Sequence, residues 1–188
     1  MVLSRNRITN FINQLGNDSI SALHNISSIK SFKKGDYLLR EGQICKCSFF
    51  IEAGVARKFY PNEGKEITTQ LFFEQDLAIS FESYALQTTS KESIQALTDI
   101  SVTVMDYLEF QEAKRAYPKL AELDILLIEH YTIWLEERMF HFHTLDAKER
   151  YLLLLQNQPH YIKKIPLTIL ASFLGISLET LSRIRAKI

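Results

Sequence analysis

The stretch "SFFIEAGVARKFYPNEGKEITTQLFF", residues 48–73, contains three runs rich in aromatic and β-branched side chains. Such runs favour strands, so we expect strands over residues 50–52, 55–60 and 66–73. Glycine, proline and asparagine supply turns at 53–54 and 61–64. Short strands that follow one another this closely predict an antiparallel β-sandwich or β-roll.

The same pattern extends in both directions from this stretch. "SIKSFKKGDYLLREG" (28–42) alternates and is interrupted by glycines, and "SIQALTDISVTVMD" (93–106) predicts two more strands around a turn at 98–99. Before them, apolar residues spaced three and four apart predict short helices within residues 4–26. We therefore expect residues 1–117 to form one β-roll sensor domain.

The next part of the chain is helical in pattern. Asp106 is a typical N-cap, and Pro118 can occupy the first turn of the helix that follows. No glycine or proline interrupts residues 118–143, which predicts one long helix with an aromatic and aliphatic stripe. We expect this stripe to be a dimerisation seam, and the alternative is that it packs on the protein's own roll. The stripe consists of Leu120, Leu123, Leu127, Tyr131, Trp134, Arg138 and His141.

Residues 169–188, "ILASFLGISLETLSRIRAKI", contain two short helical patterns that meet at Gly175. Gly175 can adopt the left-handed conformation that ends a helix, and Ser177 can cap the next one. Ala171 is small enough for close packing of two helices, while Leu181 and Ile184 would point back into the hairpin. This arrangement predicts a helix-turn-helix, and we assign residues 144–188 to an all-α DNA-binding domain. A purely structural helical hairpin is the alternative.

The charge distribution supports a nucleic-acid partner. Residues 161–188 contain five basic residues and one acid, a net charge of +4, and the whole chain is neutral, so residues 1–160 carry −4. In a major groove a carboxylate can accept from cytosine N4, and an arginine can bind guanine O6 and N7. An ordinary solvated helix face is the alternative. The candidate DNA-binding residues are Ser177, Glu179, Thr180, Ser182, Arg183, Arg185 and Lys187.

Taken together, these segments resemble the Crp/Fnr family of bacterial transcription regulators, in its short Bacteroidetes-type branch. "GDYLLREGQ", "SFFIEAGVARKFY" and "GKEI" are similar to the family's cyclic-nucleotide-binding roll, and "LGISLETLSRIR" is similar to its recognition hairpin. The resemblance implies an α+β fold, comprising a jelly roll, a dimerisation helix and a helix-turn-helix. It also implies homodimers on double-stranded DNA, with Glu179 and Arg183 as base readers and Thr180 as a phosphate contact. RNA polymerase is a further candidate partner.

Three features depart from the family pattern. "LAISFESYAL" (77–86) lacks the Gly-Glu pair that holds the ribose, and "SKESIQAL" (90–97) has Glu92 before Ser93, where the phosphate-binding arginine would stand. A carboxylate repels a phosphate, so we expect an effector other than cyclic AMP, or none, in a candidate pocket that includes Phe81, Glu82, Glu92 and Ser93. An N-terminal cysteine cluster is absent. Leu178 replaces a basic residue, and the usual winged hairpin is not among these 188 residues.

Other classes of function find little support in the sequence. There is no phosphate loop or nucleophile motif, and residues 28–105 contain no histidine, which argues against a cupin-like metalloenzyme. We therefore expect no enzyme activity, no metal and no cofactor. The remaining alternative is a ligand-binding sensor that acts through a protein partner. No apolar run approaches the roughly 20 residues of a membrane span, and no signal peptide is evident, so we expect a cytoplasmic protein.

Overall fold

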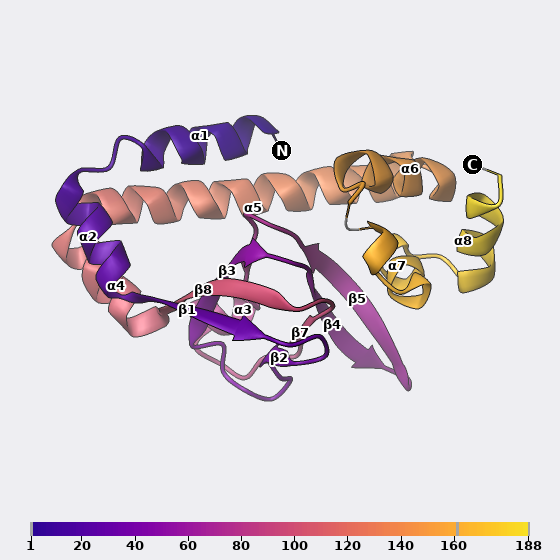
Figure 1. Cartoon of the computed structure of the whole chain (residues 1–188), viewed down its shortest axis with the longest axis horizontal. Coiled ribbons are helices and arrows are strands. Elements are labelled where there is room, and N and C mark those ends of the chain that lie inside the picture. Colours follow the sequence, from indigo (N-terminus) through magenta and orange to yellow (C-terminus); the bar gives the residue numbers. More distant parts are fainter. Residues whose placement is uncertain (1, 161, 188) are drawn as a thin grey trace. The chain divides into compact units, whose positions relative to one another are not determined.

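A computed structural model describes residues 2–160 and 162–187. The chain forms two compact units (Figure 1). One contains the N-terminal residues through Ser27 together with Asp106–Leu145, and the other contains Ser28–Met105 together with the C-terminal residues from Asp146. The fold is α+β, as the sequence predicts. The predicted functional division into 1–117, 118–143 and 144–188 stays a proposal. The two compact units have other boundaries, and each combines segments from different parts of the chain.

The roll consists of two four-stranded sheets with the strand orders β1-β8-β3-β6 and β2-β7-β4-β5. Antiparallel pairing joins β4 to β5 and to β7, β2 to β7 and β3 to β6. The predicted strands of residues 48–73 are confirmed, with ends shifted by a few residues. The strands are β1 (Ser27–Phe32), β2 (Tyr37–Leu39), β3 (Cys47–Ala53), β4 (Ala56–Asn62), β5 (Lys65–Phe72), β6 (Leu77–Ala78), β7 (Ser93–Ala96) and β8 (Ile100–Asp106), with α3 (Phe81–Leu86) after β6.

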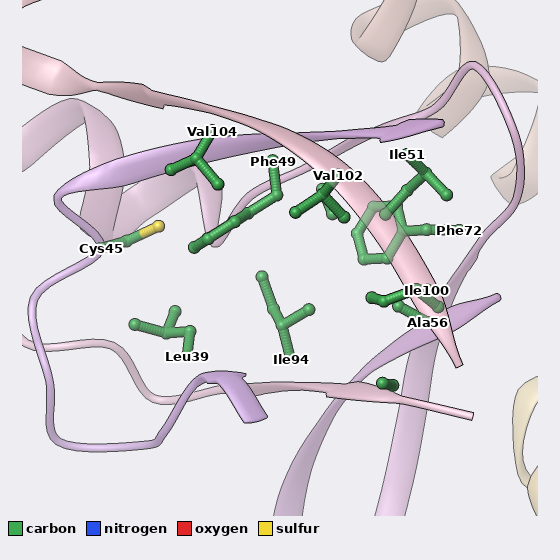
Figure 2. Close-up of a cluster of buried hydrophobic side chains, with 12 residues drawn as sticks. Leu39, Cys45, Phe49, Ile51, Ala56, Phe72, Ile94, Ile100, Val102 and Val104 are labelled. Atoms are coloured by element: carbon green, nitrogen blue, oxygen red, sulfur yellow. The ribbon is translucent and has the colours of Figure 1, made fainter. Parts of the chain in front are cut away.

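The two sheets enclose one apolar core (Figure 2). Strand β8 shows how the sequence builds it, because Ile100, Val102 and Val104 are buried and alternate with less buried residues. Hydrophobic burial of this kind provides the main driving force for folding. The core comprises Leu39, Cys45, Phe49, Ile51, Ala56, Phe72, Ala78, Ile94, Ala96, Ile100, Val102 and Val104.

The first compact unit is helical and contains α1 (Val2–Ile12), α2 (Asn17–Asn25), α4 (Tyr107–Ala116) and α5 (Pro118–Thr144). The Asp106 carboxylate accepts from the backbone N–H groups of Leu108 and Glu109 and caps α4. Pro118 opens α5, as the sequence predicts. Helix α1 packs along α5 (Figure 1), where Arg7 forms an ion pair with Glu129 at 3.1 Å.

The packing of α5 differs from the predicted stripe. Leu120 and Leu123 are buried within the described chain, and the later stripe members, from Leu127 to His141, are half-buried. The physical reason is that α1 and α4 pack on α5 and cover part of its surface. A different set of large apolar side chains stays exposed on this helix, namely Ile125, Ile128, Leu135, Met139, Phe140 and Phe142.

The C-terminal helices belong to the same compact unit as the roll. They are α6 (Ala147–Asn157), the 3-10 turn η1 (Ile162–Lys164), α7 (Leu167–Leu174) and α8 (Leu178–Arg185). A second core joins them to the roll, with Val55, Leu71, Phe73 and Leu97 on the roll side. Tyr151, Ile162, Ile165, Leu170, Ala171, Leu174 and Leu181 complete this core from the helical side.

One serine connects α7 to strand β5. The Ser172 hydroxyl accepts a hydrogen bond from the Thr68 backbone N–H at 2.8 Å. The same hydroxyl donates to the Glu66 carbonyl at 3.2 Å. Ser172 thus satisfies two backbone groups of an edge strand that would otherwise lack ladder partners on that side.

Each helix in the described ranges, 2–160 and 162–187, is too short or too polar to span a membrane by itself.

The turn after β3 requires a glycine, and this requirement can be tested. Gly54 has φ +96°, and a Cβ atom there would lie 2.6 Å from the Asp99 carbonyl oxygen. We expect Gly54→Ala to lower the free energy of unfolding by about 1–3 kcal/mol or more. Both the backbone strain at positive φ and the clash with the Asp99 carbonyl contribute to this loss. Gly64→Ala is the matched control, because Gly64 has φ +76° but open space around it. Equal losses in urea unfolding would contradict the steric argument.

The Ser172 bridge predicts a local change at β5. We expect Ser172→Ala to cost about 1–3 kcal/mol, because it leaves the Thr68 N–H without its acceptor. Amide hydrogen exchange measured by NMR should be faster at Thr68 than in the unaltered protein. Ser182→Ala, at an exposed position of α8, should leave both the exchange rate and the stability nearly unchanged. Unaltered exchange at Thr68 in the Ser172 variant would show that this contact is not formed in solution.

Candidate DNA-binding surface and effector pocket

Helices α7 and α8 form the predicted helix-turn-helix. Gly175 ends α7 in the left-handed conformation, with φ 67° and ψ 37°. The Ser177 hydroxyl then accepts from the Thr180 backbone N–H at 3.1 Å and caps α8. The two helices meet at 102°, within the range of about 90–120° typical of this motif.

Helix α8 has one buried and one exposed face. Leu181 is completely buried and Ile184 packs against the same core, as the sequence predicts. The opposite face carries polar and charged side chains, and Leu178 is 39% exposed at its N-terminal end. Of the candidate DNA-binding residues, Thr180 is half-buried, and the exposed ones are Ser177, Glu179, Ser182, Arg183, Arg185 and Lys187.

The exposed face presents an acceptor and a donor one turn apart. The pKa of the Glu179 carboxyl is lowered, first by a hydrogen bond from the backbone N–H of Glu179 and then by one from the Ser177 hydroxyl. The positive charge of Arg183 lowers it further. Arg183 Nη2 donates to Thr180 Oγ1 at 3.3 Å, which holds the guanidinium over the first turn. Glu179 is therefore an ionised acceptor beside a positioned cationic donor, which is the chemistry needed to distinguish base edges.

The roll contains a pocket of about 480 Å³. Two of the four predicted pocket residues, Glu82 and Glu92, line it, whereas Phe81 and Ser93 are not among its lining residues. Ser93 is buried, and its hydroxyl accepts from the Glu41 backbone N–H at 3.0 Å. The lining consists of Glu41, Tyr60, Pro61, Ser80, Glu82, Ser83, Thr89, Ser90, Lys91 and Glu92.

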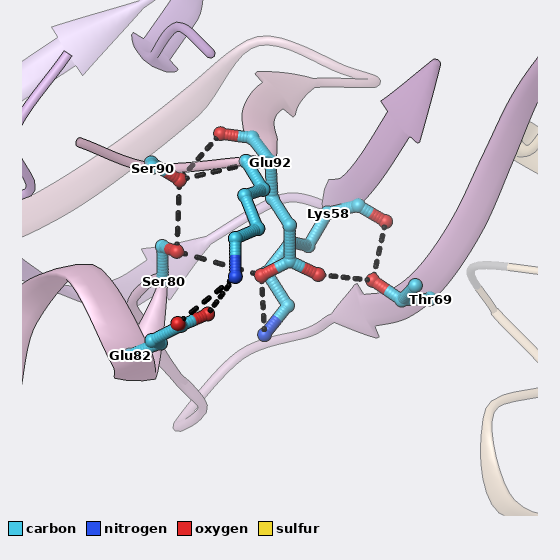
Figure 3. Close-up of polar contacts among 7 residues, drawn as sticks. Lys58, Thr69, Ser80, Glu82, Ser90 and Glu92 are labelled. Carbon is cyan, nitrogen blue, oxygen red and sulfur yellow. Dashed lines mark hydrogen bonds and ion pairs between the residues drawn. The ribbon is translucent and has the colours of Figure 1, made fainter. Parts of the chain in front are cut away.

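The Glu92 side chain contacts three groups of the chain itself (Figure 3). Its Oε2 lies 3.5 Å from Lys58 Nζ and accepts from the Ser80 hydroxyl at 3.4 Å. Its Oε1 accepts from the Thr69 hydroxyl at 3.1 Å. These partners come from β4, β5 and the N-terminus of α3.

Sequence reasoning missed the contribution of Lys58 and Thr69. One signal was present, because Arg57 and Lys58 are consecutive charged residues in an apolar strand whose side chains alternate in direction. Thr69 carried no comparable signal. Where β4 pairs with β5, Lys58 lies opposite Gln70 and the next residue, Phe59, lies opposite Thr68. Thr69 therefore has no residue opposite it on β4 and is an extra residue in β5. A β-bulge of this kind redirects a side chain, and here the hydroxyl reaches Glu92.

In the described part of the chain, no three His, Cys, Asp or Glu side chains gather in an arrangement that could hold a metal ion. Cys45 and Cys47 form no disulfide bond with each other. Burial raises the pKa of the Cys45 thiol, which makes this cysteine less reactive.

Comparison with known proteins places these features in context. Residues 29–117 match the family described as "Cyclic nucleotide-binding domain". No curated protein sequence matches the chain.

Several solved structures share the fold across nearly the whole chain. The global regulator CLP from Xanthomonas campestris has a TM-score of 0.70 and 13% identity, with 92% of this chain and 91% of that chain covered. FixK2 from Bradyrhizobium japonicum has a TM-score of 0.71 and 17% identity, with coverage of 86% and 84%. The catabolite activator protein from Thermus thermophilus has a TM-score of 0.55 and 18% identity, with coverage of 94% and 85%. Residues 29–117 are thus similar to the cyclic nucleotide-binding domain family, and the chain as a whole shares its fold with these solved structures.

Proposed function

We propose that this protein is a sequence-specific, DNA-binding transcription regulator of the Crp/Fnr type, acting in the cytoplasm as a homodimer and not as an enzyme. The observation that carries the proposal is the exposed face of α8. An ionised Glu179 and a positioned Arg183 lie there one turn apart on a capped helix of a helix-turn-helix. The effector, if one exists, differs from cyclic AMP.

The side chains of α8 divide into two roles. Glu179 and Arg183 would read base edges, because their acceptor and donor groups match cytosine N4 and guanine O6 and N7. Arg185 and Lys187, exposed near the end of the helix, would bind phosphates together with Thr180, Lys163 and Lys164. The local net charge of +4 would attract the DNA backbone even though the chain is neutral overall.

A homodimer would place two such helices on two half-sites of one duplex. The seam that fits best consists of the exposed apolar residues of α5 other than Phe140, together with Thr132; within it Ile125 is 57% and Met139 63% exposed. Its members follow one another at intervals of three, four, three, four and three residues, which is the spacing of core positions in a coiled coil. The seam residues are Ile125, Ile128, Thr132, Leu135, Met139 and Phe142.

Thr132 is the one polar member of this seam, and its position is compatible with burial. Its hydroxyl donates to the Ile128 carbonyl at 2.9 Å within the helix. The hydroxyl would therefore stay hydrogen-bonded after a second copy covered it, and no polar group would be left unsatisfied. A polar residue at one core position also helps to define the register of a coiled coil.

Base reading by α8 can be tested by substitution. We expect Arg183→Ala to weaken binding to the preferred site by about 1–3 kcal/mol, roughly 10- to 150-fold, and to relax preference at one base position. Sites selected from random duplexes, followed by affinity titration, measure both effects. Lys187→Ala is the matched cationic control. It should weaken all sequences about equally and reduce the salt slope by about one.

An unchanged selected site and affinity in Arg183→Ala would show that α8 does not read bases. Absence of salt-dependent DNA binding by the unaltered protein would instead favour a sensor that acts through a protein partner.

The seam can be tested by placing a charge in it. We expect Leu135→Glu to convert the dimer to monomer at micromolar concentration, because two carboxylates would face each other in an apolar interface. The same variant should lose affinity for a palindromic site while keeping weak binding to one half-site. Leu86→Glu is the matched control, since Leu86 is 66% exposed on α3, which belongs to the other compact unit. Sedimentation velocity measures the association, and a monomeric unaltered protein would contradict the seam.

A further inference from the structure

We propose that Lys58, Thr69 and Ser80 form an anion-binding cradle inside the roll, and that Glu92 of the same chain occupies it as an intramolecular ligand. The pocket beside this cradle would therefore exclude anionic effectors. The regulatory consequence of the proposal rests on the DNA-binding function proposed above, whereas the cradle itself does not.

The donors are built into the interior of the roll. Lys58 is only 5% exposed and Ser80 only 2%, so both polar groups lie largely out of reach of solvent. A buried ammonium is costly unless an anion pairs with it and further hydrogen bonds complete the site. The Lys58 ammonium forms an ion pair with Glu92 Oε2 at 3.5 Å. The hydroxyls of Thr69 and Ser80 donate hydrogen bonds to the two carboxylate oxygens.

Glu92 is held in place by its own backbone as well as by its side chain. Its N–H donates to the Ser90 hydroxyl oxygen at 3.0 Å, and the Ser90 hydroxyl lies 2.8 Å from the Glu92 carbonyl. The Ser90 hydroxyl also reaches Ser80 Oγ at 2.9 Å. Residue 92 is thus fixed to the same wall that provides one of the cradle donors (Figure 3).

The remaining charges of the pocket do not offer a second anion site. Lys91 is paired with Glu82 at 3.0 Å, and Glu41 is a further carboxylate in the lining. An incoming phosphate or carboxylate would have to displace Glu92 from a buried cation while facing two other acids. The cradle therefore accepts a small external anion only when the Glu92 carboxylate is removed.

The cradle lies next to the contact that holds the helix-turn-helix. Thr69 binds Glu92 through its hydroxyl, and the preceding residue, Thr68, donates its backbone N–H to Ser172 of α7. Consecutive residues of β5 thus contact the internal ligand and the DNA-binding helices. Loss of the carboxylate should loosen β5 at this point and lower the affinity for DNA.

The test compares the full-length protein with Glu92→Ala and titrates sodium formate or acetate against sodium chloride at matched ionic strength. We expect the variant to unfold at lower temperature than the unaltered protein. Formate or acetate should raise its Tm saturably, by about 3–5 °C at ten times the Kd of the anion. The unaltered protein should show no such shift, and neither cyclic AMP nor inorganic phosphate should change its Tm.

Two further variants separate the cradle from general effects. Glu82→Ala removes an exposed carboxylate that contacts Lys91 rather than Lys58, and it should not respond to formate. Adding Lys58→Met to Glu92→Ala removes the buried cation and should abolish the response. An equal formate effect in all variants, or cyclic AMP binding by the unaltered protein, would overturn the proposal. If Glu92→Ala fails to fold in chloride, folding in acetate would support the cradle, and failure to fold in acetate as well would overturn it.

DNA binding provides a second, independent readout. We expect Glu92→Ala to bind the selected site at least tenfold more weakly than the unaltered protein, and acetate to restore the affinity. If the unaltered protein binds no specific DNA, the proposed function fails while the anion-dependent Tm still tests the cradle. If DNA binding is normal but Glu92→Ala shows neither a lower Tm nor an anion response, the cradle proposal alone fails.

Discussion

The contact between Ser172 and strand β5 is the interaction on which the arrangement of the second compact unit depends. An edge strand carries backbone groups without ladder partners, and the hydroxyl of Ser172 accepts from one of them and donates to another. The apolar core around Val55, Leu71 and Leu170 joins the same helices to the roll. Strand β5 of the roll therefore contacts α7 of the helix-turn-helix directly, so a change in β5 affects both parts of the unit.

The second constraint is the buried charge of Lys58. A cation with almost no access to solvent needs an anion, and the chain supplies one from the loop before β7. The roll thus retains a polar interior of the kind suited to an anionic ligand, while its own Glu92 occupies that interior. This arrangement explains why replacement of the expected arginine by an acid at residue 92 does not leave an isolated carboxylate in the pocket.

Much of the fold was predictable because its signals are local. Turn residues and alternation located the strands of residues 48–73, while Asp106, Ser177 and Gly175 marked helix ends through their own side-chain or backbone chemistry. The face of α5 was not predictable in this way. Two stripes of the helix have apolar spacing, and the choice between them depends on where α1 and α4 pack. The sequences of α1 and α4 contain no pattern that predicts which face of α5 they pack against.

The amino-acid sequence by itself determined the order of strands and helices, the caps, and the exposed Glu179 and Arg183 of α8, since these follow from periodicity and neighbours within one or two turns. Only the tertiary structure decided that Lys58, Thr69, Ser80 and Glu92 meet. They come from four separate segments, and Thr69 is itself the extra residue of the β5 bulge, which directs its hydroxyl toward the carboxylate. Contacts of this kind depend on sheet pairing and burial, because the free energy of a buried charge is set by the groups that surround it in space.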